Sequence, residues 1–111
     1  MIPSRVLCVH ENGAVLRELQ QSLAKTGCAA VLAKDGDQAV RILHHEQIDG
    51  IVLSYDIQIA DGHALRNQIR HVCPDLPVLL FSNMDEIRDV PLQVFSDYLQ
   101  HQDLPTLAAV E

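Results

Sequence analysis

Four short stretches of the chain are apolar without polar residues at alternate positions. They are residues 6–9, 31–33, 51–53 and 78–81. A strand with one face in water alternates apolar and polar side chains, whereas a run that is apolar throughout is typical of a strand buried on both faces. The pattern therefore predicts a parallel sheet that is covered by helices on both sides.

Between these runs, apolar residues recur at the spacing of three and four that one face of a helix requires. The first helix is predicted to begin after Asn12, which fits an N-cap, and to end at Gly27, which fits the left-handed position after a helix. A second helix is predicted after residues 35–37, and a third over residues 65–72. The alternation of strands and helices favours right-handed crossovers in an open α/β sheet.

The pattern weakens after Phe81. Residues 85–90 can form one or two helical turns, but Pro91 inside a helix would remove a hydrogen bond and clash with the preceding turn. We therefore expect a short or broken fourth helix, then a fifth strand at residues 95–100 and the start of a last helix at residues 105–111. Together these elements predict one α/β domain over residues 1–111.

Composition narrows the classes of function. Eight Lys and Arg against fifteen Asp and Glu give a net charge of −7, so the chain lacks the cationic surface that binds nucleic acid or an anionic membrane. The longest apolar run, residues 28–33, is far shorter than the roughly 20 residues of a membrane span. The first residues do not form a secretory signal, and the three cysteines lack the close spacing of zinc or redox motifs. We expect a cytoplasmic protein.

The layout and several motifs resemble the receiver domain of bacterial two-component response regulators, which is of the chemotaxis-regulator type. The motifs are RVLCVHEN at residues 5–12, GCAAVLAKDG at 27–36, DGIVLSYDIQIADG at 49–62, PDLPVLLFS at 74–82 and SDYL at 96–99. The resemblance implies a flavodoxin-like three-layer α/β/α sandwich with a five-stranded parallel sheet in the order 2-1-3-4-5. It also implies signalling through protein partners.

Receivers of this family accept a phosphoryl group on an aspartate at the end of the third strand. A carboxylate suits this role because it is an oxygen nucleophile already ionised at pH 7, while Mg²⁺ and a lysine balance the charge of the group in transfer. In this sequence the matching position, eight residues before Gly62, is Ser54. We therefore expect no phosphorylation in the family's manner.

The other chemical positions differ as well. The two metal-holding acids match His10 and Glu11, and the lysine matches His101, while Asp56 stands where the family supplies a backbone carbonyl to the metal. Mg²⁺ prefers oxygen ligands in octahedral array, so its binding here is expected to be weak or absent. Since all four residues follow or end predicted parallel strands, we expect them to converge at the carboxyl edge of the sheet.

Two positions of the family's switch are retained: Ser82 matches the Ser or Thr that responds to the phosphate, and Tyr98 matches the aromatic that moves with it. The resemblance therefore indicates an atypical receiver domain, not an enzyme, that signals without phosphorylation. We expect a protein partner or a dimer to use the side formed by the fourth helix, the fifth strand and the fifth helix.

Three alternatives stay open at this point. The pocket around His10, Glu11, Asp56 and His101 could sense pH, since imidazole titrates near neutrality, or bind a borderline metal or a small ligand. Ser54 or Asp56 could be an unusual phosphoacceptor. The domain could be a module of a longer chain that carries an output or kinase domain, or it could end here.

Overall fold

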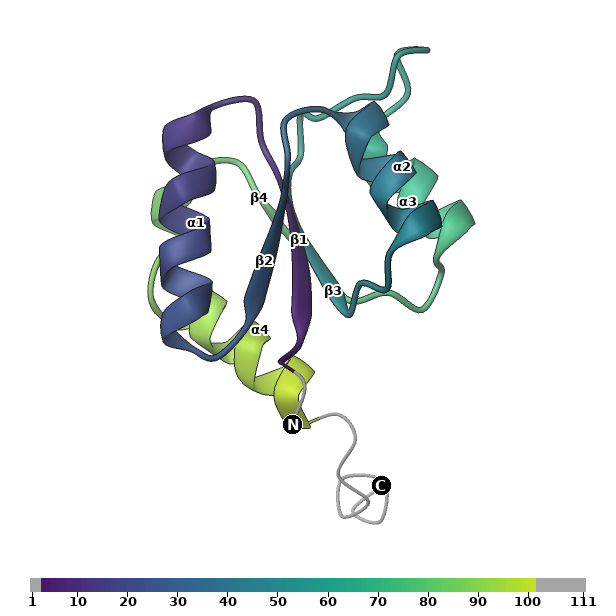
Figure 1. Ribbon diagram of the computed structural model, residues 1–111. Helices are drawn as coiled ribbons and strands as arrows, with labels where there is room; N and C mark the ends of the chain where they lie inside the picture. The colour runs from purple at the N-terminus through teal and green to yellow at the C-terminus, as the bar shows by residue number, and fades with distance from the viewer. Residues whose placement is uncertain (1–2, 102–111) are drawn as a thin grey trace.

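The computed structural model describes residues 3–101. Strands and helices alternate along the chain as β1 Arg5–Val9, α1 Gly13–Lys25, β2 Ala29–Ala33, α2 Gly36–His45, β3 Gly50–Ser54, α3 Leu65–Val72, β4 Val78–Phe81, the 3₁₀ helix η1 Met84–Glu86 and α4 Val90–His101. The described strands form one parallel sheet in the order β2-β1-β3-β4 (Figure 1).

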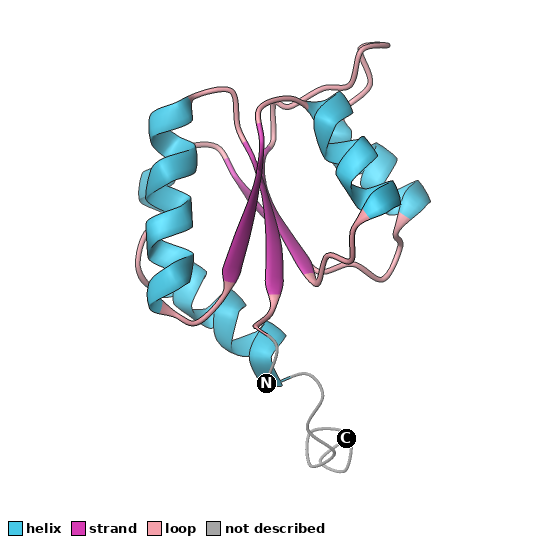
Figure 2. Ribbon diagram, viewed as in Figure 1, coloured by secondary structure: helices cyan, strands magenta, loops and turns pink. Residues whose placement is uncertain are grey.

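Helices cover both faces of this sheet, so the molecule has three layers (Figure 2). α1 and α4 pack on one face, and α2 and α3 pack on the other. Successive side chains of a strand point to opposite faces, so β1 sends Val6 and Cys8 into the first core and Leu7 and Val9 into the second. All four side chains are fully buried, which confirms the prediction of strands covered on both faces.

The predicted helix ends are confirmed where local chemistry defines them. Asn12 accepts a hydrogen bond from the Ala14 amide and caps α1, and Asp35 caps α2 by accepting from the Gln38 amide. After α1, Gly27 has a φ of 87°, a left-handed conformation that costs glycine little.

The prediction of a fifth strand at residues 95–100 is wrong, because these residues belong to α4. The buried residues of α4 are Leu92, Ser96 and Leu99, and their spacing of four and three places them on one face of a helix. Pro91 does not end this helix, because it lies in the first turn, where a backbone N–H would have no partner within the helix. A short helical piece does precede it, in the form of η1. The helix predicted at residues 105–111 lies outside the described residues.

α4 runs back along the sheet toward the amino-terminal ends of the strands (Figure 1). Near its end, Phe95 and Leu99 lie against Gly50, the first residue of β3. Gln100 donates from Nε2 to the Thr26 carbonyl at the end of α1, over 2.6 Å. The last turn of α4 therefore lies at the amino edge of the sheet.

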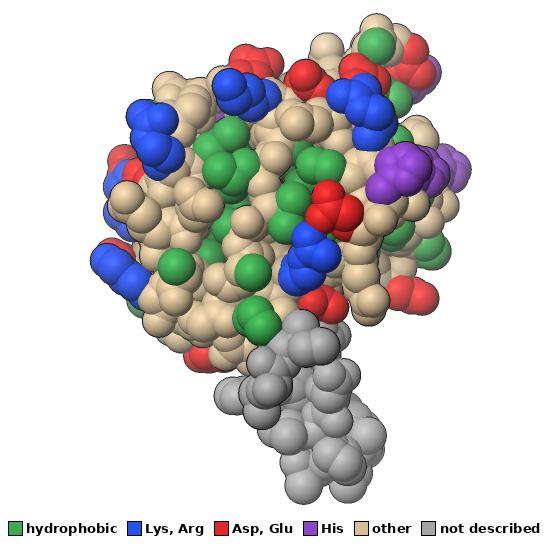
Figure 3. All heavy atoms as spheres, in the orientation of Figure 1, with side chains coloured by type: hydrophobic (Ala, Val, Ile, Leu, Met, Phe, Trp, Pro, Cys, Tyr) green, Lys and Arg blue, Asp and Glu red, His purple; other side chains and the backbone are tan. Residues whose placement is uncertain are grey.

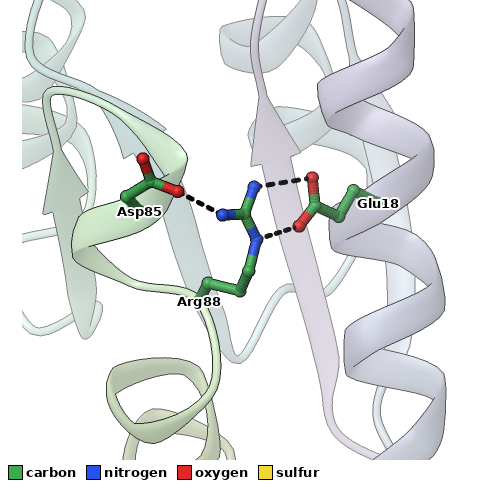
Figure 4. A network of polar contacts seen from close by, with 3 residues as sticks. All are labelled: Glu18, Asp85 and Arg88. Atoms are coloured by element: carbon green, nitrogen blue, oxygen red, sulfur yellow. Dashed lines mark hydrogen bonds and ion pairs between the residues drawn. The ribbon is translucent and has the colours of Figure 1, made fainter.

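An ion-pair network fixes the chain between η1 and α4 onto α1 (Figure 4). The Arg88 guanidinium donates to both carboxylate oxygens of Glu18, at 2.5 and 3.2 Å, and also to Asp85. These hydrogen bonds hold the pKa of Glu18 below its usual value and raise that of Arg88. Within residues 3–101, no helix has both the length and the apolar character to cross a bilayer.

Candidate functional site

The carboxyl edge of the sheet brings together residues from three strands. His10 follows β1, Ser54 ends β3, and Ser82 follows β4. The parallel pairing aligns Val9 with Leu53 and Ser54 with Phe81, so these positions share one edge. Ligands of open α/β sheets usually bind at this edge.

Ser54 is buried at the end of the central strand, with a relative exposure of 6%. Its Oγ accepts a hydrogen bond from the Asp56 amide over 3.4 Å, and its carbonyl accepts one from the Ile57 amide over 3.3 Å. Both bonds turn the chain at the start of the β3–α3 loop. The hydroxyl therefore closes a turn, which is a common use of serine where a strand ends.

His10 packs over the end of the sheet. Its ring stacks on the ring of Phe81, with centroids 5.9 Å apart and planes inclined by 10°. The Asn12 amide donates to His10 Nδ1 over 3.0 Å, so this nitrogen is an acceptor and Nε2 carries the proton of the neutral ring. Since Asn12 also caps α1, His10 belongs to the turn that begins this helix, and only Nε2 is left to meet a ligand.

Glu11 and Asp56 are the acidic members of the predicted site, and both are exposed at this edge. The matched positions also include a neutral serine and a histidine, and Mg²⁺ prefers oxygen ligands in octahedral array, so this set of residues does not fit Mg²⁺. In the part of the chain that the structure describes, no three His, Cys, Asp or Glu side chains gather closely enough to hold a metal ion.

Two residues assigned to the site do not join it. His101 was predicted to follow a fifth strand at the carboxyl edge, but it ends α4 at the amino edge instead, next to the Gln100 contact with Thr26. Tyr98 lies in the same last turns of α4 and is 56% exposed, whereas Ser82 stands at the opposite edge. The structure therefore does not bring the two predicted switch residues together.

The β3–α3 loop carries the Asp61-Gly62 motif. Gly62 has a φ of 89°, and its amide donates to the Ile59 carbonyl. Hydrogen bonds from the backbone and side chain of His63 lower the pKa of Asp61. The loop is fixed to α2 because the Ala60 amide donates to Asp37 over 3.3 Å.

Sequence reasoning missed a groove between α3 and β4. It encloses about 220 Å³ and is lined by apolar residues that include Ile69 and Leu80, and by Arg66 and Arg70. Arg66 also lies over the ring of Tyr55, at 5.5 Å from its centroid. Two arginines four residues apart on one helix of an acidic chain were the available signal for this groove.

Comparisons with known proteins agree on one family. A family model described as the response regulator receiver domain matches residues 6–97. The chain is 31% identical over 88 residues to the response regulator MprA of Mycolicibacterium vanbaalenii, an alignment that covers 79% of this chain and 38% of that protein. MprA of Mycobacterium leprae is 31% identical over 85 residues, which cover 77% and 37%. The chain thus spans well under half the length of these curated relatives.

Solved structures agree with this result at the level of the fold. A response regulator receiver domain protein from Clostridium thermocellum superposes with a TM-score of 0.69 at 13% identity, over 97% of this chain and 99% of that one. The signal receiver domain of an HD domain-containing protein from Pseudomonas fluorescens gives a TM-score of 0.66 at 22% identity, over 87% and 74%. These matches establish the flavodoxin-like α/β fold.

Proposed function

Because the chain belongs to the response regulator receiver family of two-component signalling, we propose that it is an atypical receiver that signals through protein contacts without accepting a phosphoryl group. The observation that carries this proposal is Ser54 at the carboxyl end of the central strand. The family's resemblance assigns the phosphoacceptor to this position. Receiver domains are signalling domains, and we propose no catalytic activity for this one.

The chemistry of Ser54 supports the proposal. A serine hydroxyl is neutral at pH 7 and needs a general base before it can attack phosphorus, whereas a carboxylate attacks as it stands. In this structure the Ser54 Oγ accepts a hydrogen bond from the Asp56 amide. The hydroxyl is also buried, so a phosphodonor would have to displace this turn to reach it.

The surroundings offer little to balance the charge of a transferred phosphoryl group. Of the two metal-holding positions, only Glu11 is acidic, and the other is His10, whose Nδ1 already accepts a hydrogen bond. The position matched to the family's lysine, His101, lies at the opposite edge of the sheet. Because His101 is at the opposite edge and His10 Nδ1 is already an acceptor, a metal-sensing pocket built from these residues is also not supported.

The test is incubation of the protein with acetyl phosphate and Mg²⁺, followed by intact-mass spectrometry. We expect no phosphoryl adduct on the wild-type chain, while a receiver that has the phosphoacceptor aspartate and both metal-holding acids, treated in parallel, becomes modified. An adduct on the wild type would contradict the proposal. Its loss in Ser54→Ala or in Asp56→Asn would then identify the acceptor.

The whole protein can contain more than this domain. The curated relatives are more than twice as long as the region they share with this chain. We propose that residues 1–111 form one receiver module, and that its partner is a protein, either an adjoining output domain or a separate chain, in the cytoplasm.

A further inference from the structure

A left-handed residue sets the position of α4. Asp89 precedes this helix with a φ of 72°, and it is the single non-glycine residue with a positive φ among residues 3–101. Residues other than glycine adopt this conformation at a cost in free energy, although aspartate tolerates it better than most. The Asp89 carbonyl accepts a hydrogen bond from the Gln93 amide over 3.0 Å, so the strained residue leads directly into the helix.

The residue before Asp89 is fixed to the rest of the fold. Arg88 donates from its guanidinium to Glu18 on α1 and to Asp85 (Figure 4). Its amide also donates to the Met84 carbonyl over 2.9 Å. The chain is therefore anchored as far as Arg88, and a rotation at Asp89 would move α4 while η1 stays in place.

Ser96, on the core side of α4, is buried without a partner. Its relative exposure is 0%, and its Oγ makes no hydrogen bond within the described part of the chain. A serine inside a helix can donate to the carbonyl four residues earlier, but Ser96 does not. A hydroxyl that has lost water and gained no partner destabilises the state in which it is buried. Release of α4 would return this hydroxyl to water.

The solvent side of α4 is apolar. Val90, Val94 and Tyr98 are 69%, 60% and 56% exposed, and their spacing of four places them on one side of the helix. The helix therefore directs a serine into the core and three large apolar side chains into solvent. This is the reverse of the polarity that stabilises a surface helix on its core.

The end of α4 covers a cysteine. Gln100 donates from Nε2 to the Thr26 carbonyl over 2.6 Å, and the same nitrogen lies 3.6 Å from Cys28 Sγ. Cys28 is 5% exposed and belongs to the core that α4 shares with α1. If α4 moved away, the contact that covers this thiol would move with it.

We propose that α4 is a releasable cover: residues 90–101 move away from the α1 face about a hinge at Asp89, while Arg88 stays on α1, and they uncover the core surface that includes Cys28. The inference goes beyond the proposed function, because release does not depend on whether Ser54 accepts a phosphoryl group. A protein partner that binds the released form better would shift the equilibrium toward that form.

Hydrogen exchange of the full chain at low urea, followed by mass spectrometry, measures the release. We expect the amides of α4 to exchange through an opening that leaves β1 and α1 protected, and at least roughly tenfold faster than the amides of those elements. Exchange of α4 only together with β1 would overturn the inference.

Ser96→Ala tests the unpartnered hydroxyl. We expect it to slow the exchange of α4 by roughly tenfold, since the released form no longer gains the hydration of the hydroxyl. Alanine also favours a helix, so the matched control is Val94→Ala, which makes a comparable gain in helix propensity at a position that is 60% exposed. Equal slowing in the two variants, or no slowing in Ser96→Ala, would overturn the inference.

A pair of variants at Asp89 tests the hinge. Glycine adopts a positive φ freely, whereas a β-branched side chain does so at a high cost. We expect α4 to exchange roughly tenfold faster in Asp89→Val than in Asp89→Gly, with the exchange of α1 unchanged. Equal exchange of α4 in both variants would show that Asp89 does not control the release.

Labelling with iodoacetamide, followed by peptide mapping, tests what the release uncovers. Labelling of Cys28 should slow in Ser96→Ala by the same factor as the exchange of α4, while labelling of Cys73, before β4, should not change. A rate for Cys28 that does not follow the exchange of α4 would overturn the inference. A phosphoryl adduct would overturn the proposed function without changing any of these results.

Discussion

The first three strand-and-helix units differ from the segment after β4 in how clearly the local sequence defines their secondary structure. Up to Phe81, each strand contains a run of apolar residues, and the side chains of Asn12 and Asp35 cap the first two helices. After Phe81 the described residues form η1 and α4, which packs on the same face of the sheet as α1. The difference teaches that local sequence signals determine the elements up to β4, whereas packing against distant residues such as Gly50 determines the helix that follows.

The largest expected effect on stability is in the core beneath α1 and α4, which cover the same face of the sheet. Leu19 of α1 is fully buried, and Leu92 of α4 is 3% exposed. We expect Leu19→Ala to lower the free energy of unfolding by about 2–5 kcal/mol, and Leu92→Ala to fall near the lower end of that range, because α4 can shift to close part of the cavity. Urea unfolding measures both, and equal losses would show that α4 is packed as rigidly as α1.

A pair of glycines gives a smaller contrast. A Cβ on Gly36 would lie 2.4 Å from the Gln58 carbonyl oxygen, which is backbone, whereas a Cβ on Gly50 would lie 2.8 Å from Leu99 Cδ1, at the end of a flexible side chain. We expect Gly36→Ala to cost about 1–3 kcal/mol and Gly50→Ala less. Thermal unfolding of the two variants checks the order, and the reverse order would mean that α4 cannot move away from β3.

The smallest effect concerns the ion pair that joins the two regions. In the folded protein the pKa of Glu18 is below its usual value of 4.5, because Arg88 donates to its carboxylate. A lowered folded pKa stabilises the fold above the usual pKa, and the contribution is lost as the pH falls through the folded value. The pair is partly exposed, so the effect is small.

Glu18→Gln removes this titration. We therefore expect the wild type to lose slightly more stability than the variant when the urea midpoint is measured first at pH 7 and then well below pH 4.5. Parallel losses in the two proteins would show that the Arg88 contact does not stabilise the fold in solution. Glu11→Gln, at an exposed carboxylate, serves as the control.

The sequence predicted the first part of the fold well because its signals are local. Uniform apolar runs identify strands β1, β3 and β4, and side-chain caps such as Asn12 define helix starts within two or three residues. The strand predicted at residues 95–100 was wrong because the apolar residues there fit a strand as well as a helix. The helix packs against Gly50, which is distant in sequence.

The candidate site shows the same limit. Ser54 was placed at the carboxyl end of a central strand from the motif around Gly62, and the structure has it there. The stack of His10 on Phe81 and the bond between Arg88 and Glu18 join residues about 70 positions apart, so they leave no local pattern in the sequence. The groove has the same origin, because only the fold brings Arg66 and Arg70 of α3 next to the apolar residues of β4.

Burial of Cys8 in the middle of β1 has a consequence for how the sheet opens. Its thiol is fully enclosed, and burial raises its pKa to about 12, so almost none of it is thiolate at neutral pH. An alkylating or oxidising reagent can therefore react with it only after β1 separates from its neighbours. Cys73, half-buried before β4, does not depend on that event. Modification of Cys8 therefore reports that the central strand has separated, whereas modification of Cys73 alone does not.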